Sequence, residues 1–416
     1  MQTNRRFFLR NGALALAGTA ALPSFLMRSV LAQTATAPGR RLVVIFQRGA
    51  ADGLNIVVPY SEPNYYTMRP AIAIPQNQVL DLDGFFGLHP ALAAFKPLYE
   101  QGHLAVIHAA GSPDSSRSHF DAQDYMESGT PGVKSTEDGW LNRALQAEDL
   151  RHRQEHTAFR ALALGSAVPR TLAGHIPAIA LSNVNNFAVG GQSKGPAPSP
   201  AATAFEAMYG DSGDSILHAT GEETFEAVKM LRAANPAQYK PVAGVEYPNS
   251  DFGNNMRQIA QLLKANLGVE AAFTDVGGWD THQNQGGVNG QLADRLRDFS
   301  TAIAAFWRDL GDSADNVILV TMSEFGRTAR QNGTGGTDHG HANAMFVLGG
   351  QVKGGKVYGR WPGLADEQLN EGRDLTVTTD FRQVLGEVAA KTLGVSNLDA
   401  VFPGARLRPG GFLRLV

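Results

Sequence analysis

Short apolar runs recur along this chain, and each is followed by a stretch rich in glycine or polar residues. Apolar runs of this length are typical of strands buried on both faces, as in a parallel sheet. The runs are RLVVIF at 41–46, HLAVIHAAG at 103–111, the start of 269–287, the start of 316–327, and NAMFVLGG at 343–350. Segments in which apolar residues recur at helical spacing lie between these runs. The pattern therefore predicts a fold of alternating strands and helices.

The helical patterns complete this alternation. We expect helices over 89–102, from about 113 to 128, near 221–234, over 252–267, over about 290–310, and over 378–395. The pattern predicts an α/β fold with a mainly parallel central sheet flanked by helices. Residues 40–416 then form a single domain, and the irregular, proline- and glycine-rich segment at about 185–250 is a cap or insertion over the sheet.

The first 32 residues have the pattern of an export signal. Arg5 and Arg6 precede an alanine- and glycine-rich apolar run, and a small-residue cleavage site ends at Ala32. Paired arginines in this position are typical of twin-arginine export. We therefore expect the twin-arginine translocase as a partner, a periplasmic or extracellular location, and no stable membrane span in the mature chain. An uncleaved membrane anchor is the alternative.

Composition excludes several classes of function. The chain has 416 residues, no cysteine and a net charge of −3. Removing residues 1–32 takes away four arginines and no acidic residue, so the net charge of the mature chain is −7. An acidic chain argues against general nucleic-acid binding. Without a thiolate, a bound metal must be held by His, Asp, Glu or hydroxyl groups, which favours zinc, manganese, calcium or magnesium.

Polar residues gather at the ends of the predicted strands. In chain order they are Asp52, the segment Ser115–His119, Asp280 and His282 in GGWDTH, Glu324 in SEFGR, and Asp338, His339 and His341 in GTDHGHAN. If the strands share one sheet, these groups converge on one edge. Carboxylates and imidazoles together are ligands of zinc or manganese, and there are enough of them for one or two divalent ions.

Each group also has a purely structural interpretation. Asp52 in ADGLN fits an Asp-Gly turn, and serines 115, 116 and 118 fit helix caps. Glu324 has Arg327 as a nearby ion-pair partner, and a loop hydrogen bond between Asp280 and His282 would account for WDTH. The remaining histidines are expected to be ordinary core or surface residues: His89, His103, His108, His152, His156 and His175.

As a set, RSHFDAQDYMESG, GGWDTH and SEFGRT…DHGHAN resemble the bacterial domain-of-unknown-function 1501 family of twin-arginine-exported proteins. The resemblance runs from about residue 40 to 410. That family is grouped with the alkaline-phosphatase-like superfamily, which includes sulfatases, phosphodiesterases and cofactor-independent phosphoglycerate mutases. The resemblance therefore implies an alkaline-phosphatase-like fold.

The resemblance also implies roles for individual residues. The positions that match metal ligands are Asp52, Asp280, His282, Glu324, and either His341 or His339. A serine at the head of a helix matches the nucleophile, which points to Ser116, with Ser115 and Ser118 as rivals. Phe325 stands where the superfamily has a histidine, so either His339 or His119 replaces that ligand or only one ion binds. SPDSSR lacks the sulfatase spacing, which argues against a formylglycine-type sulfatase.

Together these patterns predict an exported, metal-dependent hydrolase of phosphate or sulfate esters. Ser116 or Ser118 would be the nucleophile, with His119 beside it. Arg117 or Arg327 would bind the anionic substrate, which is a small molecule or a polymer. The alternative is a non-catalytic envelope protein on the same scaffold that binds a carbohydrate, a polymer or a partner protein.

Overall fold

The computed structural model describes residues 39–152, 156–184, 230–231, 238–408 and 411–416. The expected export signal (1–32), most of the expected cap (185–250), and the helix expected near 221–234, apart from Met230 and Leu231, lie outside these residues. Within the described residues, no helix is both long and apolar enough to cross a membrane.

One large sheet forms the centre of the molecule, with strand order β11-β5-β10-β9-β1-β8-β6-β7 and β12 paired with β5. The strands are β1 (Arg41–Gln47), β5 (Leu104–Gly111), β6 (Ala161–Leu164), β7 (Ile179–Leu181), β8 (Ala271–Val276), β9 (Val317–Met322), β10 (Asn343–Gly349), β11 (Lys356–Tyr358) and β12 (Thr379–Asp380). All pairings are parallel except those of β10 with β5 and β9. The predicted α/β fold with a mainly parallel sheet is confirmed.

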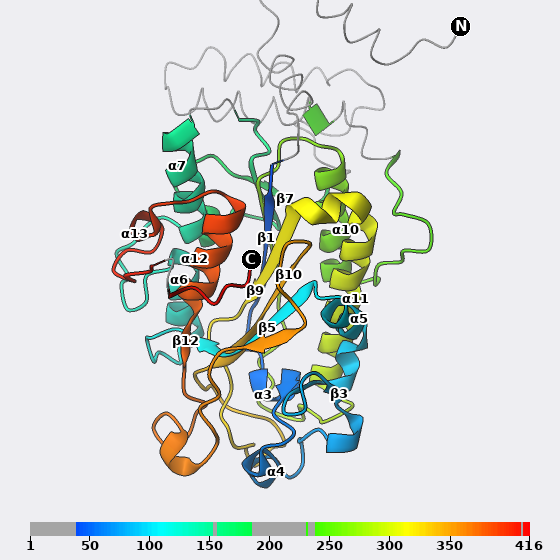
Figure 1. Cartoon of the computed structure of the whole chain (residues 1–416), viewed down its shortest axis with the longest axis vertical. Coiled ribbons are helices and arrows are strands. Elements are labelled where there is room, and N and C mark those ends of the chain that lie inside the picture. Colours follow the sequence, from blue (N-terminus) through cyan, green and yellow to red (C-terminus); the bar gives the residue numbers. More distant parts are fainter. Residues whose placement is uncertain (1–38, 153–155, 185–229, 232–237, 409–410) are drawn as a thin grey trace, which may run out of the picture.

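Helices cover both faces of this sheet (Figure 1). One face carries α5 (Lys96–Glu100), α10 (Asp251–Lys264) and α11 (Gln291–Leu310); the other carries α6 (His119–Ser128), α7 (Trp140–His152), α12 (Phe381–Thr392) and α13 (Leu398–Val401). Alternate residues of β1 serve the two layers: Val43 and Ile45 pack on the first, and Leu42 and Val44 on the second. Every residue of β1 is buried, as a strand between two helical layers requires.

Capping residues account for where several helices begin. The Ser118 side chain accepts a hydrogen bond from the Asp121 amide at the start of α6, and Ser250 accepts one from Gly253 at the start of α10. These bonds satisfy amides that have no partner in the first turn of a helix. The helix expected from about 113 therefore begins only at His119, after its cap. The helices expected over 252–267, 290–310 and 378–395 correspond to α10, α11 and α12.

The helix expected over 89–102 is divided. A 3-10 helix, η3 (Pro90–Phe95), is followed by α5, whose second residue is Pro97. Proline has no amide proton and is tolerated only in the first turn of a helix, so α5 is a new start and not a continuation. The other 3-10 segments in the described residues are η2 (Gln76–Gln78), η4 (Arg170–Leu172), η7 (Gly311–Asn316) and η8 (Asp366–Gln368).

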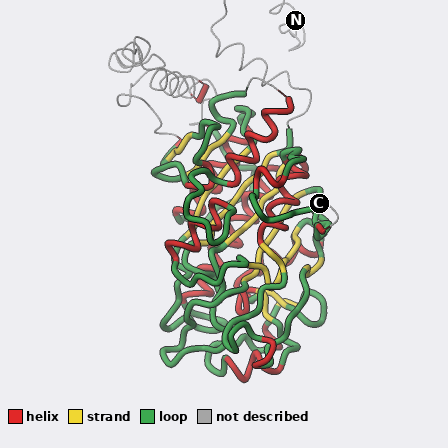
Figure 2. The backbone as a smooth tube through the Cα atoms, turned by 90° about the vertical axis from the view of Figure 1, so that its left-hand side faces the viewer, coloured by secondary structure: helices red, strands yellow, loops and turns green. Residues whose placement is uncertain are grey.

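The sequence did not indicate β6, β7, α7 or the small elements after β1. These last are α3 (Gly53–Ile56), α4 (Pro63–Met68), and a three-stranded antiparallel sheet of β2 (Val57–Val58), β4 (Gly87–Leu88) and β3 (Leu80–Asp81). They lie at the end of the molecule where loops are concentrated (Figure 2).

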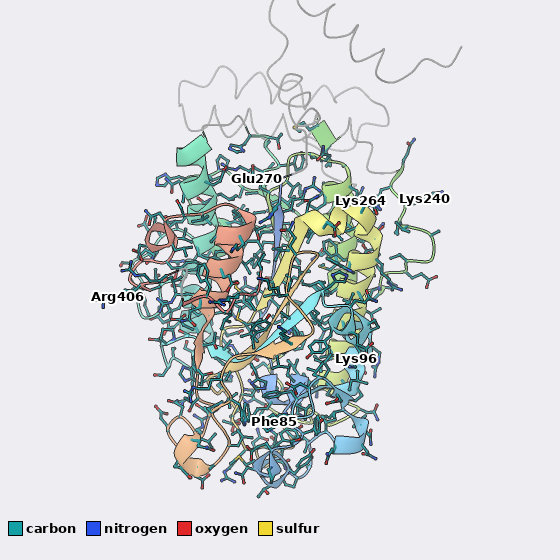
Figure 3. The ribbon with its side chains drawn as sticks, in the orientation of Figure 1. Phe85, Lys96, Lys240, Lys264, Glu270 and Arg406 are labelled. Carbon is teal, nitrogen blue, oxygen red and sulfur yellow. The ribbon has the colours of Figure 1, made fainter. Side chains whose placement is uncertain are left out.

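The direction of β10 determines which residues meet at the carboxyl edge of the sheet. Figure 3 shows Glu270, which precedes β8, near one end of the molecule and Phe85 near the other. The strands parallel to β8 therefore end on the Phe85 side. Because β10 runs the opposite way, its amino end lies at this same edge. The segment before β10, which contains GTDHGHAN, is thus brought beside the loops that follow β1, β5, β8 and β9.

Candidate metal centre

Three imidazoles and one carboxylate meet at this edge and form what we call the histidine cluster: His119, Asp280, His282 and His339. Nε2 of His339 lies 3.0 Å from Nε2 of His119 and 3.0 Å from Nε2 of His282. Asp280 Oδ1 lies 3.0 Å from His282 Nε2 and 3.3 Å from His339 Nε2, and its Oδ2 lies 3.5 Å from His119 Nε2. The structure brings these four of the strand-end residues together.

The other nitrogen of each imidazole faces an acceptor. The bonds are His119 Nδ1 to Glu324 Oε1 at 2.8 Å, His282 Nδ1 to Asp338 Oδ1 at 3.0 Å, and His339 Nδ1 to the Arg117 carbonyl at 2.9 Å. A carboxylate or carbonyl oxygen only accepts, so the hydrogen-bond network assigns a proton to each Nδ1. In the neutral rings, all three Nε2 atoms then present lone pairs to the centre of the cluster.

This arrangement fits a divalent cation. The ligand atoms of His119, Asp280 and His339 all lie within 4.8 Å of one another. A tetrahedral ion with bonds of about 2.0–2.1 Å needs ligand atoms roughly 3.3 Å apart, close to the observed separations of 3.0–3.5 Å. The His119 and Asp280 side chains are 25% and 43% exposed, so the cluster is reached from solvent.

Glu324, expected to be a ligand, lies behind His119. Its Oε1 accepts from His119, from the Gly49 amide at 2.8 Å and from Gln123 Nε2 at 2.8 Å, and its Oε2 accepts from Ser323 Oγ at 3.1 Å. Burial acts to raise the pKa of Glu324, but these hydrogen bonds, that of His119 first, hold it below its usual range. The same hydrogen bond raises the pKa of His119, whereas burial lowers the pKa of His339.

Arg327 is buried and holds Asp280. The sequence had suggested instead that it would bind the anionic substrate or pair with Glu324. Its Nη1 donates to Asp280 Oδ1 at 2.7 Å, and its Nε and Nη2 donate to Thr337 at 3.2 and 2.5 Å. Burial acts to raise the pKa of Asp280, but the Arg327 hydrogen bond outweighs it and the pKa is lowered. The guanidinium is thus occupied by Asp280 and Thr337, and among the described residues it forms no ion pair with Glu324.

Phe325 forms a wall of the cluster. Its buried ring lies 5.0 Å from the His119 ring and 5.1 Å from the His339 ring, measured between centroids. The two imidazoles that the sequence offered as replacements for the missing histidine thus both lie against Phe325.

Asp52 is not brought to the histidine cluster, contrary to its expected place among the ligands. It lies before α3 and is fully buried, with its oxygens 2.6 and 2.9 Å from the guanidinium of Arg69. Gln285 Nε2 donates a third bond at 2.6 Å. A carboxylate with these partners is already neutralised and hydrogen-bonded, which leaves no basis for placing it among the ligands.

Two other expected ligands also lie outside the cluster. The His341 ring donates from Nε2 to the Ser112 carbonyl at 2.8 Å and does not face the other imidazoles. Asp338 accepts from His282 Nδ1 and from Asn332 Nδ2 at 3.1 Å, and the His282 bond lowers its pKa. Asp338 therefore orients a cluster residue, as Glu324 does.

The serine segment lies directly before His119, as expected. Ser115 is exposed, the Ser116 hydroxyl accepts from the Ser118 amide at 3.3 Å, and the Ser118 hydroxyl caps α6. In the described part of the chain, neither hydroxyl hydrogen-bonds to the cluster. Arg117 is paired with Glu371 at 2.7 Å and with Asp374 at 3.0 Å, so its guanidinium, too, is already neutralised by carboxylates.

Sequence reasoning missed the residues that support the site. Gln123 bonds Glu324, and Arg69 and Gln285 bond Asp52. No spacing rule marks a buried glutamine or arginine in a loop, because its partners come from distant segments. The histidines set aside as ordinary include His89 and His108, which are buried and hydrogen-bonded to backbone carbonyls.

Comparison with curated proteins gives no match. Solved structures that the chain resembles include the C-terminal periplasmic domain of EptC from Escherichia coli in complex with Zn, at 10% identity, over 76% of this chain and 74% of that one, with a TM-score of 0.35. A 2-O GAG sulfatase aligns at 9% identity over 86% and 71%, with a TM-score of 0.37. Wild-type alkaline phosphatase PafA aligns at 10% identity over 70% and 64%, with a TM-score of 0.33. At these values the likenesses carry no inference about activity.

The sequence profile described as "Protein of unknown function (DUF1501)" matches residues 99–402, most of the chain, and the chain belongs to that family.

Proposed function

We propose that this protein is an exported, divalent-metal-dependent hydrolase of phosphate or sulfate esters. The observation that supports the proposal is the meeting of three imidazole lone pairs with the Asp280 carboxylate. Lone pairs 3.0 Å apart repel unless a cation lies between them. A single proton bridges one such pair, whereas a divalent ion accepts several ligand atoms at once.

The ligand set supports zinc or manganese. His119, Asp280 and His339 would hold the ion, and His282 is adjacent. Three protein ligands with an open position are typical of catalytic sites, while structural zinc is usually enclosed by four. When bound, the ion would polarise the ester and lower the pKa of a nucleophilic hydroxyl.

The surrounding residues would hold the ligands in place. Glu324 and Asp338 keep the protons of His119 and His282 on Nδ1, so that each Nε2 stays available. Such carboxylate–histidine pairs fix the tautomer and orientation of metal-binding histidines. Arg327 fixes the rotamer of Asp280 through Oδ1.

Ser116 is the proposed nucleophile, with Ser118 as the alternative. Both lie in the segment that leads into α6, whose first residue is His119. The amino end of a helix carries partial positive charge and stabilises an anionic group. With the guanidinium groups of Arg117 and Arg327 already paired, this end of α6 and the ion would bind the anion of a small-molecule or polymer ester.

Export by the twin-arginine translocase to the periplasm or exterior is part of the proposal. It rests on Arg5 and Arg6 and the apolar run after them. Replacing both arginines by lysine should leave the precursor in the cytoplasm, as fractionation and immunoblotting would detect. Equal export of the variant would remove the basis for this location.

A non-catalytic binding protein remains the second candidate. It is favoured by one observation, that neither serine hydroxyl hydrogen-bonds to a cluster histidine in the described residues. Such a protein would bind metal without turning over esters.

The decisive experiment measures metal content. The mature protein would be purified without chelators or a histidine tag and analysed by plasma mass spectrometry, then assayed with p-nitrophenyl phosphate, bis-p-nitrophenyl phosphate and p-nitrophenyl sulfate. We expect one to two zinc, manganese or calcium ions per chain and hydrolysis that EDTA removes. A chain that holds no metal and takes none up on titration contradicts the proposal. Bound metal without turnover favours the second candidate.

A further inference from the structure

Gln285 joins the two loops that carry most of the histidine cluster. Its Oε1 accepts from Thr281 Oγ1 at 2.7 Å and from Thr337 Oγ1 at 2.9 Å. Thr281 lies between Asp280 and His282, and Thr337 lies two residues before His339. The first bond therefore ends between two residues of the cluster, and the second ends two residues before a third.

The opposite side of the same amide is anchored to the core. Gln285 Nε2 donates to Asp52 Oδ2 at 2.6 Å, and Asp52 is held by both terminal nitrogens of Arg69. Arg69 then donates to the carbonyls of Thr328 and Ala329 at 2.8 and 3.0 Å. The hydrogen bonds thus connect the loop that contains Thr281 and Gln285 with the segment that contains Thr328 and Ala329.

This network is buried, and none of its buried side-chain polar atoms lacks a hydrogen-bond partner. Asp52, Arg69, Gln285 and Thr337 are each 0% exposed and Thr281 is 3% exposed. The amide has one possible orientation, because the hydroxyls must donate to its oxygen and the carboxylate must accept from its nitrogen. A satisfied buried network fixes the groups it connects, and a partly satisfied one is costly.

The loops are also in direct backbone contact. The Thr337 amide donates to the Thr281 carbonyl at 3.2 Å. At Gly336, a Cβ atom would lie 2.3 Å from the His282 carbonyl oxygen, a distance no side chain tolerates. Glycine before the TDHGH sequence is therefore what allows the loops to approach, and Gln285 holds them there.

We infer that Gln285, anchored by Asp52 and Arg69, is the positioning residue that sets the separation of the ligand-bearing loops. Asp52 acts here as a buried anchor and not as a ligand. The effect on metal affinity rests on the proposed function, whereas the effect on the loops does not.

The test compares Gln285→Met with Gln258→Met. Gln258 is also a buried amide with two hydrogen bonds, but it lies on α10 and its partners, the Val184 amide and the Asn254 carbonyl, belong to neither cluster loop. Hydrogen–deuterium exchange of 277–290 and 327–341 would be measured in the metal-free protein, and zinc affinity by competition with a chromophoric chelator. Global unfolding in urea reports general destabilisation.

We expect Gln285→Met to speed exchange in both loops and to weaken zinc binding by about 10- to 100-fold, as loss of an outer partner of a metal site does. Gln258→Met should change global stability without either effect. Unchanged exchange in both loops, or a pattern equal to that of Gln258→Met, would overturn the inference.

A second pair guards against misfolding of Gln285→Met. Thr337→Val removes the hydroxyl at nearly constant volume, and Thr337→Ser keeps it. The inference requires Thr337→Val to speed exchange in the loops and to weaken zinc binding, and Thr337→Ser to behave like wild type in both measurements. Equal behaviour of the two variants contradicts the inference. If wild-type protein binds no zinc, the proposed function fails, and the exchange measurements alone decide the positioning role.

Discussion

Nε2 of His119 lies 3.0 Å from Nε2 of His339, and each ring donates a hydrogen bond from its Nδ1 to an oxygen acceptor. In the neutral state this contact places one lone pair against another. A cation between the two nitrogens would remove this repulsion, and His282 and Asp280 direct two further donor atoms at the same place.

Removing either facing histidine should therefore remove the metal. We expect His339→Ala and His119→Ala to lose bound zinc after equilibrium dialysis, as measured by plasma mass spectrometry. His341→Ala is the matched control, because His341 is two residues from His339 but bonds the Ser112 carbonyl instead. Loss of zinc in His341→Ala with retention in His339→Ala would show that the ligands lie elsewhere.

Glu324 should tune zinc affinity without being a ligand. Glu324→Gln keeps the size of the side chain but weakens the acceptor for His119 Nδ1, so we expect zinc to bind about 10- to 100-fold more weakly and still be retained at saturation. Glu270→Gln is the control, because Glu270 accepts from His156 Nδ1 at the same 2.8 Å but lies at the other end of the sheet (Figure 3). Complete loss of zinc in Glu324→Gln would restore Glu324 to the ligands.

The sheet and the meeting of the strand-end groups were predictable from sequence. Apolar runs such as RLVVIF indicate buried parallel strands, and parallel strands bring their carboxyl ends to one edge. Asp280, His282 and His339 were identified for this reason. The same reasoning placed the segment Ser115–His119 at this edge, and His119 was one of two candidates to replace the missing histidine ligand; its imidazole lies with those three.

The roles of the carboxylates were not predictable in the same way. Asp52, Glu324 and Asp338 all follow or precede strands, yet Asp52 pairs with Arg69 and the other two bond histidine Nδ1 atoms. Sequence position places a residue at the edge of the sheet. Whether it faces the ion or the ring of a neighbour depends on rotamers and on partners from distant segments, such as Arg69 and Gln285.

The buried pair of Asp52 and Arg69 should show strong energetic coupling. Arg69→Met leaves a carboxylate buried without its cation, so we expect the free energy of unfolding to fall by about 3–5 kcal/mol. Adding Asp52→Asn removes that stranded charge, so the double variant should be more stable than Arg69→Met alone. Urea denaturation of wild type, Arg69→Met, Asp52→Asn and the double variant completes this double-mutant cycle. Additive costs would mean that the two residues do not act as a pair.

The serines should separate into a nucleophile and a cap. If Ser116 is the nucleophile, Ser116→Ala lowers the kcat for p-nitrophenyl phosphate by roughly 1,000-fold or more while zinc affinity is unchanged. Ser118→Ala loses the cap of α6 and should cost about 1 kcal/mol of stability while keeping turnover. The reverse result assigns Ser118, and retention of turnover in both excludes Ser116 and Ser118 as the nucleophile.

The stability of the fold should fall with acid because of His108. This residue of β5 is 2% exposed, its Nε2 donates to the Val57 carbonyl at 3.0 Å, and its Nδ1 accepts from the Ala109 amide at 2.8 Å. Its ring stacks on Phe86 and meets Trp361 edge-on. Burial lowers the pKa of His108 from 6.5 to about 4.

The sign of the effect follows from proton binding. Between pH 6.5 and about 4 the unfolded chain binds a proton at His108 and the folded chain does not, so stability falls as pH falls through this window. The full loss is about 3 kcal/mol, since one pKa unit corresponds to about 1.4 kcal/mol. Urea denaturation at pH 7 and pH 5 should show wild type losing its advantage over His108→Gln as the pH falls. Val106→Ala, a non-titrating change in the same buried strand, should keep a constant deficit at both values. A His108→Gln deficit that is equally constant would mean that this histidine does not contribute to the acid sensitivity of the fold.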